Sequence, residues 1–165
     1  MILLEIEHVK ECMSKLLLSD IFDPFYFIEG EIVTFNTFKI DGYLKKNSFT
    51  SEEQEEMGSR EYSLWKDIRE FCFSLIKGKK TPLSFHLVFG LSRANIEKLL
   101  LKQDLTFTPS DVNGLYMNLK YDGSHLQCVT GTSMHTFTLD KSLEQAWDNM
   151  VEKFFQIQGI ETERK

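Results

Sequence analysis

The chain has 165 residues, a hydrophobic fraction of 42% and a net charge of −6 at pH 7. This length predicts a single domain over residues 1–165, with a core large enough to need no disulfide or metal. The negative charge argues against a nucleic-acid partner, because duplex binding rests mainly on cationic contacts to phosphate. No apolar run approaches the roughly 18 residues of a membrane span, so we expect no membrane segment.

The first part of the chain predicts one helix and two strands. Residues 2–6 are a short strand or the run-in to a helix, and helical spacing of apolar residues follows from about 9 to 17. Aromatic and β-branched residues then predict strands at about 26–35 and 37–46. Gly30, between two glutamates, indicates a bulge or bend in the first of these strands.

The middle of the chain alternates between helix and strand. Residues 51–61 are polar and acidic, which predicts a solvated, mobile loop. An apolar stripe follows over 64–76, and we expect Ser63 to cap this helix and Gly78 to end it. Error-free alternation over 83–91 predicts a half-buried strand. The spacing then predicts a helix capped by Ser92 and a loop over 104–113.

The C-terminal part predicts a hairpin, a third strand and a closing helix. Asp122-Gly123 lies between two alternating runs, and a two-residue turn there would pair Leu119 with Leu126. That register exposes Lys120 and His125. A third strand is expected at about 133–139, followed by a helix capped within 140–142 and stopped at Gly159. Residues 161–165 are expected to be a frayed tail.

Together these elements predict an α+β fold of two layers, with a mostly antiparallel sheet and helices packed on one face. The strand patterns alternate rather than being uniformly apolar, which argues against a parallel sheet covered on both faces. The three cysteines, Cys12, Cys72 and Cys128, are scattered and in phase with apolar neighbours, which indicates reduced, buried thiols. With no signal-peptide pattern at the N-terminus, we expect a cytoplasmic protein.

Candidate functional residues are few. Lys77, Lys79 and Lys80 form a basic cluster before the strand that carries His86, and together these four residues are the predicted binding site for an anionic group. The lysines also complement the dipole at a helix C-terminus, and that structural explanation stays open beside the binding one. Their effect on binding should weaken with salt.

No catalytic, metal or cofactor motif is present in the sequence. No phosphate-binding loop, GxGxxG, GxSxG, HExxH or calcium-binding loop occurs. No two of the four histidines have ligand spacing, so neither a metal site nor a cofactor is predicted. Ser133 and His135 would share a strand face near Asp140, but a strand start with polar edge residues and a helix cap explains them better than a nucleophilic pair.

Several segments together resemble a known family. They are LLLSD at 16–20, FD at 22–23, TFNTFKIDG at 34–42, YSLWK at 62–66, GTS at 131–133 and FTLD at 137–140. The chain resembles a family of uncharacterised proteins, with a domain of unknown function, from anaerobic, clostridia-like bacteria. The resemblance implies a cytoplasmic bacterial protein and supplies no site residue.

Three functional hypotheses remain open at this stage. The first is a non-catalytic domain that binds a protein partner or a small anionic ligand. The second is an enzyme whose site lies on the polar face of the sheet around His86. The third is self-association as a homo-oligomer through exposed aromatic side chains. A cleft that contains His86 and a carboxylate would favour the enzyme.

Overall fold

A computed structural model describes residues 1–76 and 81–165. Within those residues the chain forms eight strands, five α-helices and two short 3₁₀ segments. The strands are β1 (Leu3–Ile6), β2 (Tyr26–Val33), β3 (Thr37–Asp41), β4 (Ser63–Leu64), β5 (Ser84–Gly90), β6 (Val112–Tyr121), β7 (Leu126–Met134) and β8 (Thr162–Arg164). The helices are α1 (Val9–Leu18), α2 (Ser51–Met57), α3 (Trp65–Ile76), α4 (Arg93–Lys102) and α5 (Ser142–Ile157), and the 3₁₀ segments are Lys46–Ser48 and Pro109–Asp111.

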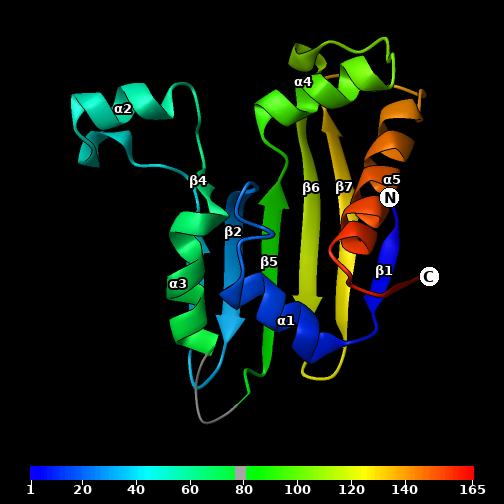
Figure 1. The fold of residues 1–165 in the computed structure, drawn as a ribbon. Coiled ribbons are helices and arrows are strands. Elements are labelled where there is room, and N and C mark those ends of the chain that lie inside the picture. The colour runs from blue at the N-terminus through cyan, green and yellow to red at the C-terminus, as the bar shows by residue number, and fades with distance from the viewer. Residues whose placement is uncertain (77–80) are drawn as a thin grey trace.

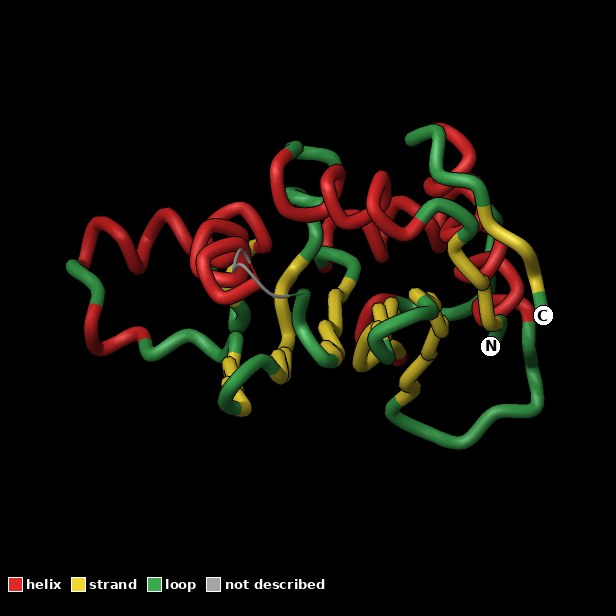
Figure 2. The backbone as a smooth tube through the Cα atoms, turned by 90° about the horizontal axis from the view of Figure 1, so that it is seen from below, coloured by secondary structure: helices red, strands yellow, loops and turns green. Residues whose placement is uncertain are grey.

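All the strands belong to one antiparallel sheet. Its order is β3-β2-β5-β6-β7-β1-β8, and β4 pairs with the start of β2 beyond the end of β3. Helices α1, α3 and α5 lie across one side of this sheet, whereas none of the described α-helices covers the opposite side (Figures 1 and 2). We call the first side the covered face and the second the open face. The predicted α+β, two-layer architecture is therefore confirmed.

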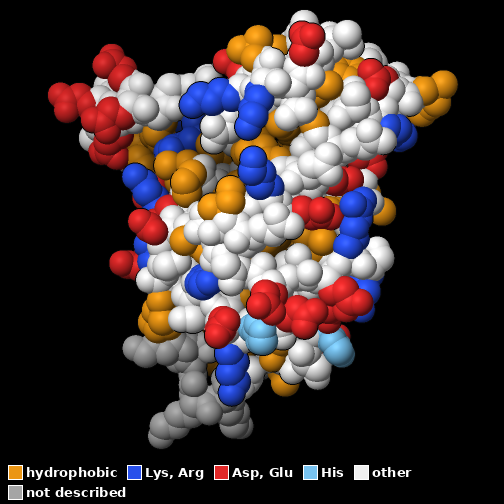
Figure 3. Space-filling model, turned by 45° about the vertical axis from the view of Figure 1, so that its right-hand side comes forward, with side chains coloured by type: hydrophobic (Ala, Val, Ile, Leu, Met, Phe, Trp, Pro, Cys, Tyr) orange, Lys and Arg blue, Asp and Glu red, His pale blue; other side chains and the backbone are white. Residues whose placement is uncertain are grey.

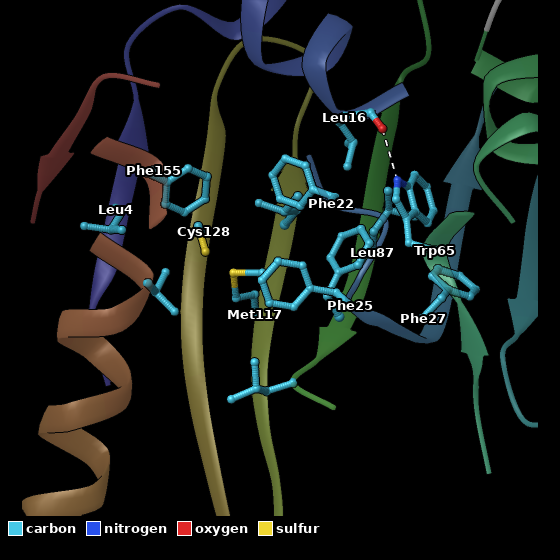
Figure 4. Close-up of a cluster of buried hydrophobic side chains, with 14 of the residues drawn as sticks. Leu4, Leu16, Phe22, Phe25, Phe27, Trp65, Leu87, Met117, Cys128 and Phe155 are labelled. Carbon is cyan, nitrogen blue, oxygen red and sulfur yellow. Dashed lines mark hydrogen bonds between the residues drawn. The ribbon is translucent and has the colours of Figure 1, made fainter. Parts of the chain in front are cut away.

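The core lies between the covered face and the helices. Helix α5 presents Leu143, Trp147, Val151 and Phe155, one turn apart, and all four are buried. Figure 4 shows side chains from α1, α3, α5 and the central strands meeting in this layer. The indole Nε1 of Trp65 donates to the carbonyl oxygen of Leu16 at 3.0 Å, which satisfies the one polar atom of that buried ring.

Segment 51–61 is not the loop that the sequence predicted. Residues Ser51–Met57 form helix α2, since the Thr50 side chain accepts from the backbone N–H of Glu53 at 3.2 Å and acidic residues occupy the first turn. No residue of α2 is buried, and the helix projects away from the sheet (Figure 1). The prediction failed because a cap and helix dipole can fold a charged segment that has no apolar stripe.

Residues at the start of α3 also differ from the prediction. Ser63 is not a helix cap, because Ser63–Leu64 pair with Tyr26 and Phe27 as strand β4. The expected C-terminal Gly78 lies outside the described residues. At α4 the prediction is confirmed, since the Ser92 side chain accepts from the backbone N–H of Asn95.

The predicted hairpin forms, but with a longer turn. Asp122 Oδ1 accepts from the backbone N–H groups of Ser124 at 2.9 Å and His125 at 2.7 Å, which closes a four-residue loop. Leu119 therefore pairs with Cys128 and not with Leu126. A shift of two residues keeps every side chain on its predicted face, so Lys120 and His125 are exposed as expected.

Two further predictions in the C-terminal part were wrong. Strand β7 continues through Gly131 to Met134, because the ten-residue β6 offers it partners along its whole length, and residues 135–141 form a loop with exposed Phe137 and Leu139. The expected frayed tail instead contains β8, which pairs with β1. In the described ranges no helix is long and apolar enough to cross a membrane.

Candidate functional site

A cleft lies at the end of the sheet where β5 ends and β6 begins. Helix α4 and the segment that leads from α2 to β4 stand on either side of this end (Figure 1). The cleft has a volume of about 390 Å³. Its lining residues come from β2, the 59–62 segment, the end of β5, helix α4, β6 and the loop after β7. Because it joins segments far apart in the sequence, the cleft exists only in the folded chain.

The floor of the cleft is the ring of Tyr116 on β6. Gly90 of β5 and Gly131 of β7 are its partners on the two neighbouring strands. At Gly114 an added Cβ would lie 2.2 Å from the Tyr116 hydroxyl oxygen, so the ring extends along its own strand over that glycine. Any side chain at 114 would have to displace the ring. Small residues around one large ring leave a flat, accessible aromatic surface.

One wall is aromatic. Tyr26 and Tyr62 line the cleft, and Tyr62 is held by a backbone bridge and an edge-to-face ring contact with Tyr43, at 5.9 Å between centroids. Burial raises the pKa of Tyr62, with smaller contributions from Tyr116 and Glu61. The phenol is therefore neutral at pH 7 and can donate a hydrogen bond.

Arg60 supplies a positive charge without a partner. It lines the cleft and forms no ion pair with any described residue. Its Nε is shielded from solvent and has no hydrogen-bond acceptor in residues 1–76 and 81–165. Arg93, the other guanidinium in the lining, instead donates to the backbone carbonyl oxygens of Val112, at 2.7 Å, and Pro109. Arg93 therefore fastens α4 to the start of β6, whereas Arg60 is left to meet an acceptor from outside the chain.

His86 lies elsewhere, in a shallow hollow of about 430 Å³ on the open face, which Glu29, Glu31 and Asp41 also line. Its register partner on β2 is Glu31. His86 and the Tyr116 cleft are separate places on the sheet, since they share no lining residue.

The tautomer of His86 follows from its neighbour Asn118. The Asn118 Nδ2 donates to the carbonyl oxygen of Val129 at 3.2 Å, so its Oδ1 faces His86 Nε2 at 3.1 Å. The neutral ring therefore carries its proton on Nε2, and its Nδ1 is an acceptor with no hydrogen-bond donor among the residues that the structure describes. Among the described residues that line this hollow, none is a Ser, Thr or Cys. The arrangement can accept a proton but has no nucleophile of its own.

Two other groups of residues were considered in the sequence, the three predicted binding lysines and the disfavoured Ser133–His135 pair. Lys77, Lys79 and Lys80 lie outside the described residues, so their role in binding stays a prediction. Ser133 and His135 share no hydrogen bond in the described part of the chain, and the Ser133 Oγ accepts from Asn113 Nδ2 at 3.2 Å. Among the described residues no group of three or more His, Cys, Asp or Glu side chains is placed to hold a metal ion.

Sequence reasoning missed Arg60, Tyr62 and Tyr116. The first two lie in or beside the segment interpreted as a solvated loop, and Tyr116 looked like an ordinary open-face strand residue. One signal was present: Gly90 and Gly114 each interrupt a strand, and a glycine in a strand often marks close approach of another group.

Comparisons with known proteins give a family and no activity. The family described as "Family of unknown function (DUF5721)" matches residues 15–163. No curated protein matches the chain. No solved structure matches it either.

Proposed function

We propose that the chain, which belongs to this family of unknown function, is a binding domain for a small ligand with a flat ring and an anionic group. The single observation that carries this proposal is the buried, unpartnered Nε of Arg60 in the cleft. Leaving a buried donor without an acceptor costs about 1–3 kcal/mol, and more for a charged group. A ligand carboxylate or phosphate would remove that cost.

The aromatic residues of the cleft support the ring in the ligand. Tyr26, Tyr62 and Tyr116 present three rings around one space, and stacking on such rings adds to the free energy gained by burying apolar area. The volume of about 390 Å³ falls in the range of small-molecule pockets. Glu61 also lines the cleft, which favours a single anionic group placed at Arg60 over a highly charged ligand.

The test uses phenyl phosphate, benzoate and adenosine monophosphate as probes, with benzyl alcohol as the neutral control, and measures binding by ligand-observed NMR. We expect at least one anionic probe to bind more tightly than benzyl alcohol. Arg60→Gln should weaken that binding about tenfold or more, because a hydrogen bond to a charged group contributes about 1.5–3 kcal/mol. Arg164→Gln, at an exposed arginine outside the cleft, is the matched control and should leave binding unchanged. The proposal would be overturned if the Arg60 variant bound the anionic probe as tightly as the parent protein, or if benzyl alcohol bound as tightly as the anionic probes.

A second candidate is proton-transfer catalysis at His86. It is favoured by one observation, the free Nδ1 acceptor in a hollow that also contains three carboxylates. The check is hydrolysis of p-nitrophenyl acetate, in which His86 would act as a general base on water. Catalysis above buffer that disappears in His86→Gln and persists in His8→Gln would favour this function, and the same rate in all three proteins would reject it.

A further inference from the structure

A second groove lies on the other side of the molecule from the open face, between α4 and α5. Its volume is about 290 Å³. The lining residues are Asn95, Lys98, Leu99, Lys102, Gln103, Ala146, Asn149, Met150 and Lys153. They recur every three or four positions on each helix, so one face of each helix forms one wall. This groove shares no residue with the Tyr116 cleft.

Three lysines of the groove have no partner. Lys98, Lys102 and Lys153 form no ion pair and no hydrogen bond within residues 1–76 and 81–165, and no acidic side chain lines the groove. The neighbouring carboxylate of Glu152 pairs with Arg164 instead, at 3.2 Å. The whole chain holds 25 acidic residues and 19 lysines and arginines. The groove is therefore positively charged, although the net charge of the whole chain is negative.

The floor of the groove is apolar. Leu99 is buried, and Ala146 and Met150 are partly buried against the core. Met is flexible and polarisable, so it adapts to apolar ligands of different shape. Figure 3 shows basic side chains beside apolar ones on the upper part of this side of the molecule, while acidic side chains gather lower down and at the projecting upper left. Cations beside an apolar floor fit a ligand that has a charged head and an apolar body.

We propose that the α4–α5 groove binds a small organic anion with an apolar body, of the medium-chain carboxylate class. The lysines neutralise the head and the Leu99–Met150 floor receives the body. The groove volume of about 290 Å³ lies near the lower end of the range for small-molecule sites, which suits a ligand of about ten non-hydrogen atoms. Octanoate has that size. The site is independent of the Arg60 cleft and of the function proposed for it.

The experiment titrates octanoate into isotopically labelled protein and follows backbone amide shifts by NMR. Two further probes separate the contributions of the charged head and the apolar body to binding. Octan-1-ol lacks the charge, and acetate lacks the apolar body. We expect saturable shifts on α4 and α5 with octanoate, and weaker binding of both control compounds. Raising the salt from about 0.02 to 0.2 M should weaken octanoate binding, because screening shortens the reach of exposed charges.

Variants separate the lysines from general surface charge. Lys98→Gln with Lys102→Gln should weaken octanoate binding about tenfold or more, whereas Lys10→Gln with Lys66→Gln, which removes two exposed lysines elsewhere, should not change it. Met150→Gln should weaken binding while leaving all charges in place. Circular dichroism confirms that each variant is folded.

Several outcomes would overturn the proposal. The first is that octan-1-ol or acetate binds as tightly as octanoate. The second is that the Lys10/Lys66 variant loses as much octanoate affinity as the Lys98/Lys102 variant, and the third is that the amide shifts are confined to the Tyr116 cleft. Tighter binding of a glutamate-rich peptide than of octanoate would assign the groove to a macromolecular partner and also overturn it. Arg60→Gln should leave octanoate binding intact, so failure here and failure of the proposed function are distinguishable.

Discussion

The two faces of the same sheet have opposite characters, although their residues alternate along the same strands. On β5 and β6 the covered face holds Leu87 and Leu119, which are fully buried. Next to each of them in sequence, the open face holds His86 on β5 and Lys120 on β6. The covered face therefore determines stability, whereas the open face can hold polar and charged side chains without a desolvation cost. Substitutions on the two faces should differ accordingly.

The largest difference is expected between Trp147 and Lys120. Trp147 is 1% exposed, and its Nε1 donates to the carbonyl oxygen of Tyr116 at 3.0 Å. Trp147→Ala should lower the free energy of unfolding by about 3–5 kcal/mol, since truncation leaves a cavity under the covered face. Lys120→Ala, on the exposed side, should change it by less than about 0.5 kcal/mol. Urea denaturation measures both, and a loss below about 1 kcal/mol for Trp147→Ala would show that α5 is peripheral.

A smaller difference is expected between two glycines. At Gly30 an added Cβ would lie 2.8 Å from Leu87 Cδ2 and 2.9 Å from Phe27 Cζ, within the covered face. At Gly131 the nearest atoms would be at 3.9 Å. Gly30→Ala should therefore destabilise the protein by about 1–3 kcal/mol through overpacking. Gly131→Ala should be neutral or slightly stabilising, because it restricts the unfolded chain. Equal midpoint temperatures for the two variants in thermal denaturation would contradict this contrast.

The smallest effect per step, counted for each pH unit, concerns the thiols of the core. Burial raises the pKa of Cys12 and of Cys72 to about 12, from 9.0, and also raises the pKa of Cys128. Above pH 9 the unfolded chain loses these protons while the folded chain keeps them. Stability from each thiol is thus present below pH 9 and is lost as the pH rises towards 12.

For one thiol the loss amounts to about 1.4 kcal/mol per pH unit. Unfolding free energies of Cys72→Ala, measured by urea titration between pH 9 and 11, should fall less steeply than those of the parent by about that amount. Parallel curves would mean that the Cys72 thiol ionises in the folded state. Native thiols should also react slowly with a thiol reagent and quickly once unfolded, as expected for buried cysteines.

The sequence predicts the elements that a local pattern specifies. The alternation in 112–130 places Leu119 and Lys120 on their correct faces even though the turn is two residues longer than expected, because the side-chain period of a strand is two. The stripe of α5 and the Ser92 cap are likewise local. A pattern of this kind needs no knowledge of the partner.

Features that depend on a distant partner could not be predicted. Strand β8 is too short and polar to be recognised alone, and it forms because β1 offers a free edge. The cleft is a stronger case, since Arg60, Tyr116 and His135 come together only when the sheet order is known. The alternation of β5 places His86 on the correct face, but no local pattern indicates that Asn118 orients its ring.

The hydrogen bond between Trp147 and Tyr116 has an optical consequence. Tyr116 turns its ring towards the cleft and its carbonyl oxygen towards the indole on the opposite side of the sheet. A ligand that shifts the ring by a few tenths of an ångström should therefore alter the environment of the Trp147 fluorophore. The chain's other indole, Trp65, is bonded to Leu16 and lines no part of the cleft. A Trp65→Phe protein would thus retain a single tryptophan, Trp147, which is hydrogen-bonded to the backbone of the residue that forms the floor of the cleft.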